Sequence, residues 1–167
     1  MNRKIGAILV LLSLASLLTA FTICIDPGHQ EKANLSQEQI APGSSETKAK
    51  VSTGTRGVNT GIPEYVFNLE LSFILRDRLQ EENFDVVMTR ERHDVDVSNI
   101  ERAELANSAA ADLCIRLHAN YSSDPSLKGM MLLIPSPTAT YTAPIYEESR
   151  RASEKIMASL QQIEGIT

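Results

Sequence analysis

The stretch TICIDPGHQ, residues 22–30, largely decides how this chain folds. Its first residues favour a strand, and the Asp-Pro-Gly that follows is typical of a tight turn. The apolar run predicts a buried strand over residues 22–26. The turn then presents His29 directly after the carboxyl end of that strand. The rest of the sequence has to show whether this imidazole has ligand-type neighbours.

The composition indicates a globular protein. A chain of 167 residues favours one domain, and 43% apolar with 22% charged residues supports a packed core. The net charge is −5. This acidic balance argues against nucleic acid or an anionic membrane surface as the main partner.

The amino-terminal segment differs from the rest of the chain. Arg3 and Lys4 precede an uncharged apolar run of 17 residues at 5–21. This layout predicts that residues 1–21 are a signal peptide or a membrane anchor, and both alternatives stay open because no Ala-x-Ala cleavage site is present. Residues 22–167 are then the folded domain, which we expect to be extracytoplasmic, either secreted or anchored.

Helices and strands alternate along that domain. A long polar segment at 30–62, with short strands near Val51 and Val58, has the length of a functional loop. Proline 63 then opens a helix to about residue 82, with a buried stripe expected through Phe67, Leu71 and Leu75. The remaining predicted elements are strands at 84–89, 112–118 and 129–135, a helix from the capping box at Ser98 to about Ala110, and a last helix at about 143–162.

This order predicts an α/β fold, a mainly parallel twisted sheet flanked by helices. The chain stops just after a helix, where such a domain normally adds strands, so we expect its C-terminal strands to be missing. Cys24 and Cys114 each lie in an apolar strand-like run and are expected to be buried thiols. A disulfide between them would require adjacent strands in register, which the sequence does not show.

Three ligand-type side chains are predicted to share one edge of the sheet. His29 and His118 each follow the carboxyl end of a strand, and Glu64 lies in the first turn of a helix, pointing towards the sheet. Two imidazoles and a carboxylate are a frequent set of catalytic zinc ligands. The alternatives are structural histidines and a glutamate that merely complements the helix dipole. Glu70 is a rival ligand expected at the rim, and His93 lies in a charged loop where we expect it to be exposed.

The motifs IDPGHQ, PEYVFNLEL and ERAELANSAAADLCIRLHAN together resemble the zinc-dependent N-acetylmuramoyl-L-alanine amidases from about residue 23 to the chain end. The resemblance implies that His29, Glu64 and His118 bind Zn²⁺, with Asn68 and Leu69 completing the glutamate motif. It also implies a hydrolase that cleaves the amide between N-acetylmuramic acid and L-alanine in peptidoglycan, the expected partner. We expect a monomer that contacts the membrane only through its N-terminal segment.

The chain departs from the family pattern in several places. Gln30 stands where glycine is usual, the 30–62 loop is long, and Arg116 precedes Leu-His-Ala-Asn where serine is frequent. Arg116 is either a contact at the rim of the site or half of a structural ion pair. The family's general-base glutamate, usually in Glu-x-Gly-Phe, has no counterpart here, so we expect it beyond Thr167. Two further hypotheses therefore remain: a catalytically silent peptidoglycan-binding or regulatory module, and a zinc hydrolase that cleaves a different peptide bond.

Overall fold

The computed structural model describes residues 20–124 and 126–163. Of the predicted signal or anchor segment, residues 1–19 lie outside this range. Among the described residues, no helix combines the length and the apolar character that crossing a membrane requires.

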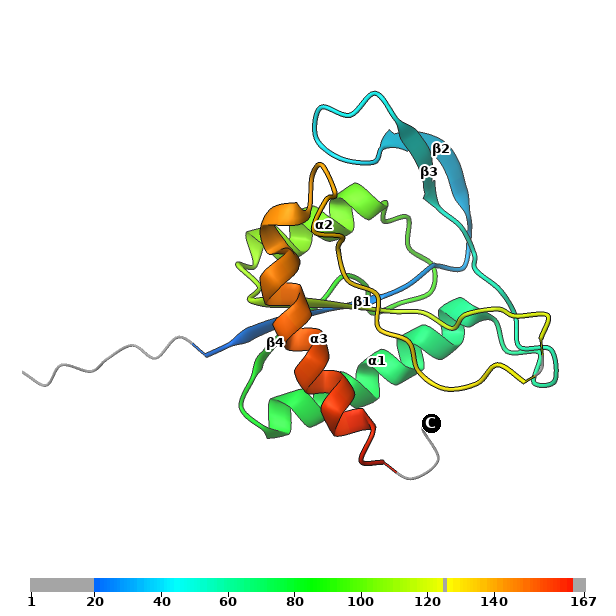
Figure 1. Ribbon diagram of the computed structural model, residues 1–167. Coiled ribbons are helices and arrows are strands. Elements are labelled where there is room, and N and C mark those ends of the chain that lie inside the picture. Colours follow the sequence, from blue (N-terminus) through cyan, green and yellow to red (C-terminus); the bar gives the residue numbers. More distant parts are fainter. Residues whose placement is uncertain (1–19, 125, 164–167) are drawn as a thin grey trace, which may run out of the picture.

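A three-stranded parallel sheet forms the centre of the molecule. Strand β1 (Thr22–Pro27) pairs with β4 (Asp85–Met88) on one side and with β5 (Leu113–Leu117) on the other. Helix α1 (Glu64–Glu81) covers one face of the sheet and α2 (Asn99–Ser108) the other (Figure 1). The buried apolar run of β1 is typical of a central parallel strand covered on both faces. The predicted α/β fold with a parallel sheet is confirmed.

The long polar segment contains a β-hairpin. Strands β2 (Asn34–Gln39) and β3 (Thr47–Val51) pair antiparallel beyond the end of β1 (Figure 1). The predicted strand near Val51 is confirmed. The one near Val58 is wrong, because Val58 is 87% exposed in a turn. The polar sequence of β2 has no alternating apolar pattern that would have predicted a strand.

Helix α1 forms where the sequence predicts it, but it buries a different stripe. The buried residues facing the sheet are Glu64, Asn68 and Ser72, spaced one turn apart, with Leu69 beside them. Phe67 and Leu71, predicted to be buried, are exposed. Polar residues are tolerated in this interface because they are hydrogen-bonded: the Asn68 amide donates to the Gly28 carbonyl at 3.2 Å and the Ser72 hydroxyl to the Asn68 carbonyl at 2.7 Å.

The end of the described chain is partly as predicted. Residues 143–145 form a 3₁₀ turn, η1 (Ala143–Ile145), that continues into helix α3 (Tyr146–Leu160). The strand predicted at 129–135 is wrong: this segment has no regular secondary structure, and Met131 and Leu133 are exposed. An apolar run becomes a strand only where a neighbouring strand accepts its backbone hydrogen bonds, and no described strand does so here.

The two cysteines lie side by side in the sheet. Cys24 in β1 and Cys114 in β5 are directly paired residues of adjacent parallel strands, and both are free thiols. Cys24 is buried as predicted, whereas Cys114 is exposed, contrary to the prediction. The hydrogen bond with Cys114 is the main cause that raises the pKa of the Cys24 thiol, and the same bond lowers the pKa of Cys114.

Candidate metal centre

The fold brings His29, Glu64 and His118 together, as predicted. His29 follows β1, Glu64 is the first residue of α1, and His118 follows β5. One ligand atom of each residue lies within 4.8 Å of the others. Oxygen Oε1 of Glu64 is 3.3 Å from Nε2 of His29 and 3.0 Å from Nδ1 of His118. Three segments that are far apart in sequence therefore converge on one carboxylate.

The carboxylate of Glu64 is ionised at neutral pH. The residue is only 4% exposed, and burial by itself raises its pKa. Hydrogen bonds from the Thr55 amide (2.8 Å), from His118 and from the Ala119 amide (3.0 Å) outweigh this effect and lower the pKa to about 2. Charged hydrogen bonds of this kind favour the deprotonated form, which is the form that binds metals.

The ring of His29 is oriented by a group on the far side from Glu64. Its Nδ1 lies 3.0 Å from the Ser52 carbonyl oxygen, so Nδ1–H donates this bond and Nε2 faces Glu64 with its lone pair. Burial lowers the pKa of His29, and the Ser52 carbonyl and Glu64 offset this effect only in part. A neutral imidazole held by a backbone carbonyl is the usual arrangement of a metal-binding histidine.

Two glycines allow the three side chains to approach. A Cβ on Gly54, whose φ is +78°, would lie 2.6 Å from Cδ2 of His29 and 2.7 Å from Oε2 of Glu64. A Cβ on Gly28 would lie 2.5 Å from Cε1 of His118. Any larger residue at either position would displace a candidate ligand. The sequence analysis missed Gly54, Ser52 and Thr55, and the only signal for them was the Gly/Thr-rich composition of the long polar segment.

These residues fit a zinc ion. One buried, ionised carboxylate and two imidazoles, each with a nitrogen close to it, form the donor set of many catalytic zinc sites. The side chain of His118 is 44% exposed, so one side of the cluster faces solvent. Substrate or water can therefore reach this cluster from outside.

The other candidates of the sequence analysis lie outside the cluster. Glu70 is exposed on α1, as predicted. The expectation that His93 is exposed is wrong: it is half-buried, its ring centroid is 5.4 Å from that of Tyr65, and its Nδ1 is buried without a partner. Arg116 forms an ion pair with Asp26, which supports the structural alternative for this residue.

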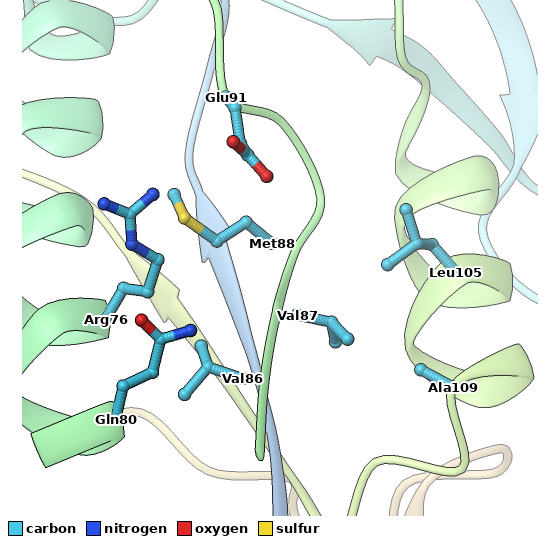
Figure 2. A pocket seen from close by; sticks show the side chains of 8 residues that line it. All are labelled: Arg76, Gln80, Val86, Val87, Met88, Glu91, Leu105 and Ala109. Carbon is cyan, nitrogen blue, oxygen red and sulfur yellow. The ribbon is translucent and has the colours of Figure 1, made fainter. Parts of the chain in front are cut away.

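One hollow of the described surface lies away from this cluster. Figure 2 shows it beside β4, between α1 and α2, with Arg76, Val87 and Leu105 among its lining residues. None of the three candidate ligands lines it. The candidate metal ligands therefore lie at the edge of the sheet where β1 and β5 end, and not in this hollow.

Comparisons with known proteins identify relatives of this fold. An N-acetylmuramyl-L-alanine amidase from Mycobacterium abscessus, solved in its apo form, is 25% identical with a TM-score of 0.54, over 60% of this chain and 48% of that one. An N-acetylmuramyl-L-alanine amidase from Mycobacterium smegmatis is 22% identical with a TM-score of 0.62, over 83% of this chain and 65% of that one, and supports the fold alone.

The chain thus spans roughly half to two thirds of the length of these structures. No curated protein matches it. The sequence pattern of the family described as N-acetylmuramoyl-L-alanine amidase matches residues 23–167, nearly the whole length. This chain belongs to the N-acetylmuramoyl-L-alanine amidase family.

Proposed function

We propose that this chain is the catalytic domain of a zinc-dependent hydrolase, with His29, Glu64 and His118 as the metal ligands. The observation that carries the proposal is the convergence of two imidazoles on one ionised carboxylate, from three separate segments, within 4.8 Å. A buried carboxylate between two imidazoles favours a cation that balances its charge and binds the imidazole lone pairs.

Each residue of the cluster has a defined part in this proposal. His29 and His118 offer nitrogen lone pairs, and Glu64 supplies the negative charge that favours a divalent cation. Ser52 and Thr55 fix the orientations of His29 and Glu64 through hydrogen bonds. A bound zinc ion supplies the chemistry of such enzymes, since it lowers the pKa of water and polarises a carbonyl.

Family membership supports the substrate. We assign the activity to the amide between N-acetylmuramic acid and L-alanine, with peptidoglycan as the partner. The substrate lies outside the cytoplasmic membrane, so we place the domain, residues 22–167, in the cell wall and assign residues 1–21 to export or anchoring. Within residues 20–124 and 126–163, no further His, Cys, Asp or Glu joins the cluster, so no general base is assigned here.

Metal analysis tests the ligand set. The purified chain should bind about one zinc ion, and His29→Ala, Glu64→Ala and His118→Ala should each weaken binding by more than the ~10–100-fold typical of an outer-shell partner. Glu70→Ala and His93→Ala are matched controls that should retain zinc. Unchanged zinc content in all three ligand variants would refute the proposal.

Product analysis separates the amidase from the alternatives. Incubation with purified peptidoglycan should release stem peptides with a new amino-terminal L-alanine. A silent module, which the lack of an assigned general base favours, would co-sediment with peptidoglycan and release no such peptide. A hydrolase of another bond would cut the stem peptide and leave the muramyl amide intact.

A further inference from the structure

Arg90, on the loop after β4, is a buried cation at the base of the metal centre. The residue is 3% exposed, and its guanidinium donates only to backbone carbonyls. Its Nε donates to Pro27 at 2.9 Å and its Nη1 to Arg92 at 3.1 Å. Its Nη2 donates to Gly28 at 3.1 Å and to Tyr65 at 2.8 Å.

The two carbonyls that share Nη2 belong to neighbours of two candidate ligands. Gly28 directly precedes His29, and Tyr65 directly follows Glu64. One nitrogen atom therefore joins the backbone that carries His29 to the backbone that carries Glu64. Because a guanidinium is planar and rigid, this bond pair fixes the separation of the two segments more tightly than a flexible donor would.

Burying this charge is expensive, and no counterion among the described residues contacts it. Among the described residues, no carboxylate pairs with Arg90, since the nearby Asp26 pairs with Arg102 and Arg116. Burial lowers the pKa of Arg90 to about 10, with Arg102 adding to the effect and Asp26 opposing it, so the guanidinium stays charged at neutral pH. The carbonyls are therefore the only described groups that accept hydrogen bonds from the charged guanidinium, and Asp26 acts on it without a direct ion pair.

The turn that Arg90 holds has a backbone conformation that needs support. His29 has a φ of +62°, in the left-handed region that residues other than glycine seldom adopt. The neighbouring carbonyls also accept bonds from other elements: Asn68 of α1 donates to Gly28 at 3.2 Å, and Arg102 of α2 donates to Pro27 at 2.9 Å. These other donors keep the turn folded when Arg90 is replaced, whereas among the described donors only Arg90 connects it to Tyr65.

We propose that Arg90 is a positioning residue that sets the distance between His29 and Glu64, so that both can bind the same metal ion. The inference rests on the proposed zinc centre. It assigns to Arg90 an effect on metal affinity and geometry beyond a contribution to stability.

Two substitutions separate positioning from stability. Arg90→Met is similar in length, removes all donors and also removes the uncompensated buried charge, so the variant should fold. Arg90→Lys keeps the charge, but its single ammonium cannot reproduce the planar fork. Ile23→Ala is the control for lost stability, because Ile23 lies in the core at the end of β1 that is farther from His29. Arg78→Lys, at an exposed position, is the control for replacing an arginine by a lysine.

The measurements are zinc affinity by chelator competition and the visible absorption spectrum of the Co²⁺-loaded chain, on protein shown to be folded by circular dichroism. Both Arg90 variants should bind zinc at least ~10-fold more weakly, with a changed Co²⁺ spectrum. Both controls should bind within about twofold of the unmodified chain.

The outcomes are distinct. A zinc affinity and a Co²⁺ spectrum equal to those of the unmodified chain, in either Arg90 variant, would overturn the positioning role. The proposed zinc centre would remain in place. A loss of affinity in Ile23→Ala as large as in the Arg90 variants would also overturn it, because stability alone would then explain the effect. Failure of the unmodified chain to bind zinc would refute the proposed function itself, and the inference with it.

Discussion

At the scale of single residues, Asp26 does more than shape a turn. The sequence suggests turn chemistry for Asp-Pro-Gly, but the Asp26 side chain is buried between Arg102, at 2.7 Å, and Arg116, and it accepts a hydrogen bond from Thr89 at 2.5 Å. Burial raises the pKa of Asp26, and the two arginines with Thr89 outweigh burial, so the pKa lies below its ordinary value. The turn before His29 is thus anchored through a buried ion-pair network.

The first prediction concerns the pH dependence of this network. Asp26→Asn should lower the free energy of unfolding by about 3–5 kcal/mol at pH 7, since it removes the negative charge that pairs with two arginines. Because the pKa of Asp26 is lower in the folded state, its contribution is complete above the ordinary value near pH 4 and is lost as the pH falls through the folded value.

Urea unfolding of both proteins between pH 3 and pH 7 measures this difference. The exposed Asp77→Asn serves as the control and should change stability by less than about 0.5 kcal/mol. A gap between unmodified protein and Asp26→Asn that is equally large at pH 3 and pH 7 would contradict the prediction.

At the scale of elements, one carboxylate helps to hold the β2–β3 hairpin against α2. Glu38 of β2 is buried, and its oxygens accept the backbone N–H groups of Asn99 at 3.0 Å and Ile100 at 3.3 Å, at the amino end of α2. Negative charge at a helix amino terminus is favourable. Within α2 itself the predicted capping box between Ser98 and Glu101 is present, so two carboxylates serve this helix end.

The second prediction concerns this attachment. Glu38→Ala should destabilise the fold by about 1–2 kcal/mol and speed hydrogen exchange in the hairpin more than in the central sheet, since the hairpin loses one of its attachments to α2. Hydrogen exchange read by mass spectrometry checks this. The exposed Glu46→Ala, in the same segment, should leave the exchange unchanged, and equal protection of the hairpin in both variants would count against the anchor.

At the scale of the whole molecule, the metal centre joins three parts of the fold. Its candidate ligands follow β1, begin α1 and follow β5, so they come together only when the sheet has formed and α1 has packed on it. A cation bound there stabilises the folded state, because the unfolded chain lacks the assembled site.

The third prediction follows from this linkage. Zinc at about 100 times its dissociation constant should stabilise the chain by ~2.7 kcal/mol, which raises the Tm by about 5–10 °C. Thermal unfolding followed by circular dichroism, with zinc and with a chelator, measures the shift. His118→Ala should show no such shift, and a zinc effect of equal size in that variant would place the stabilising ion elsewhere.

Local patterns in the sequence determined the helices, the three strands of the central sheet and the identity of the candidate ligands. The apolar run of β1, the capping box of α2 and the histidines after β1 and β5 depend on near neighbours in the chain, so they could be predicted. The tertiary structure decided the features that depend on distant segments. It decided that α1 buries Asn68 and Ser72 and exposes Phe67, that residues 129–135 pair with no described strand, and that Arg90 bridges the backbones next to His29 and Glu64. These features arise from contacts between residues dozens of positions apart, and no local periodicity encodes such contacts.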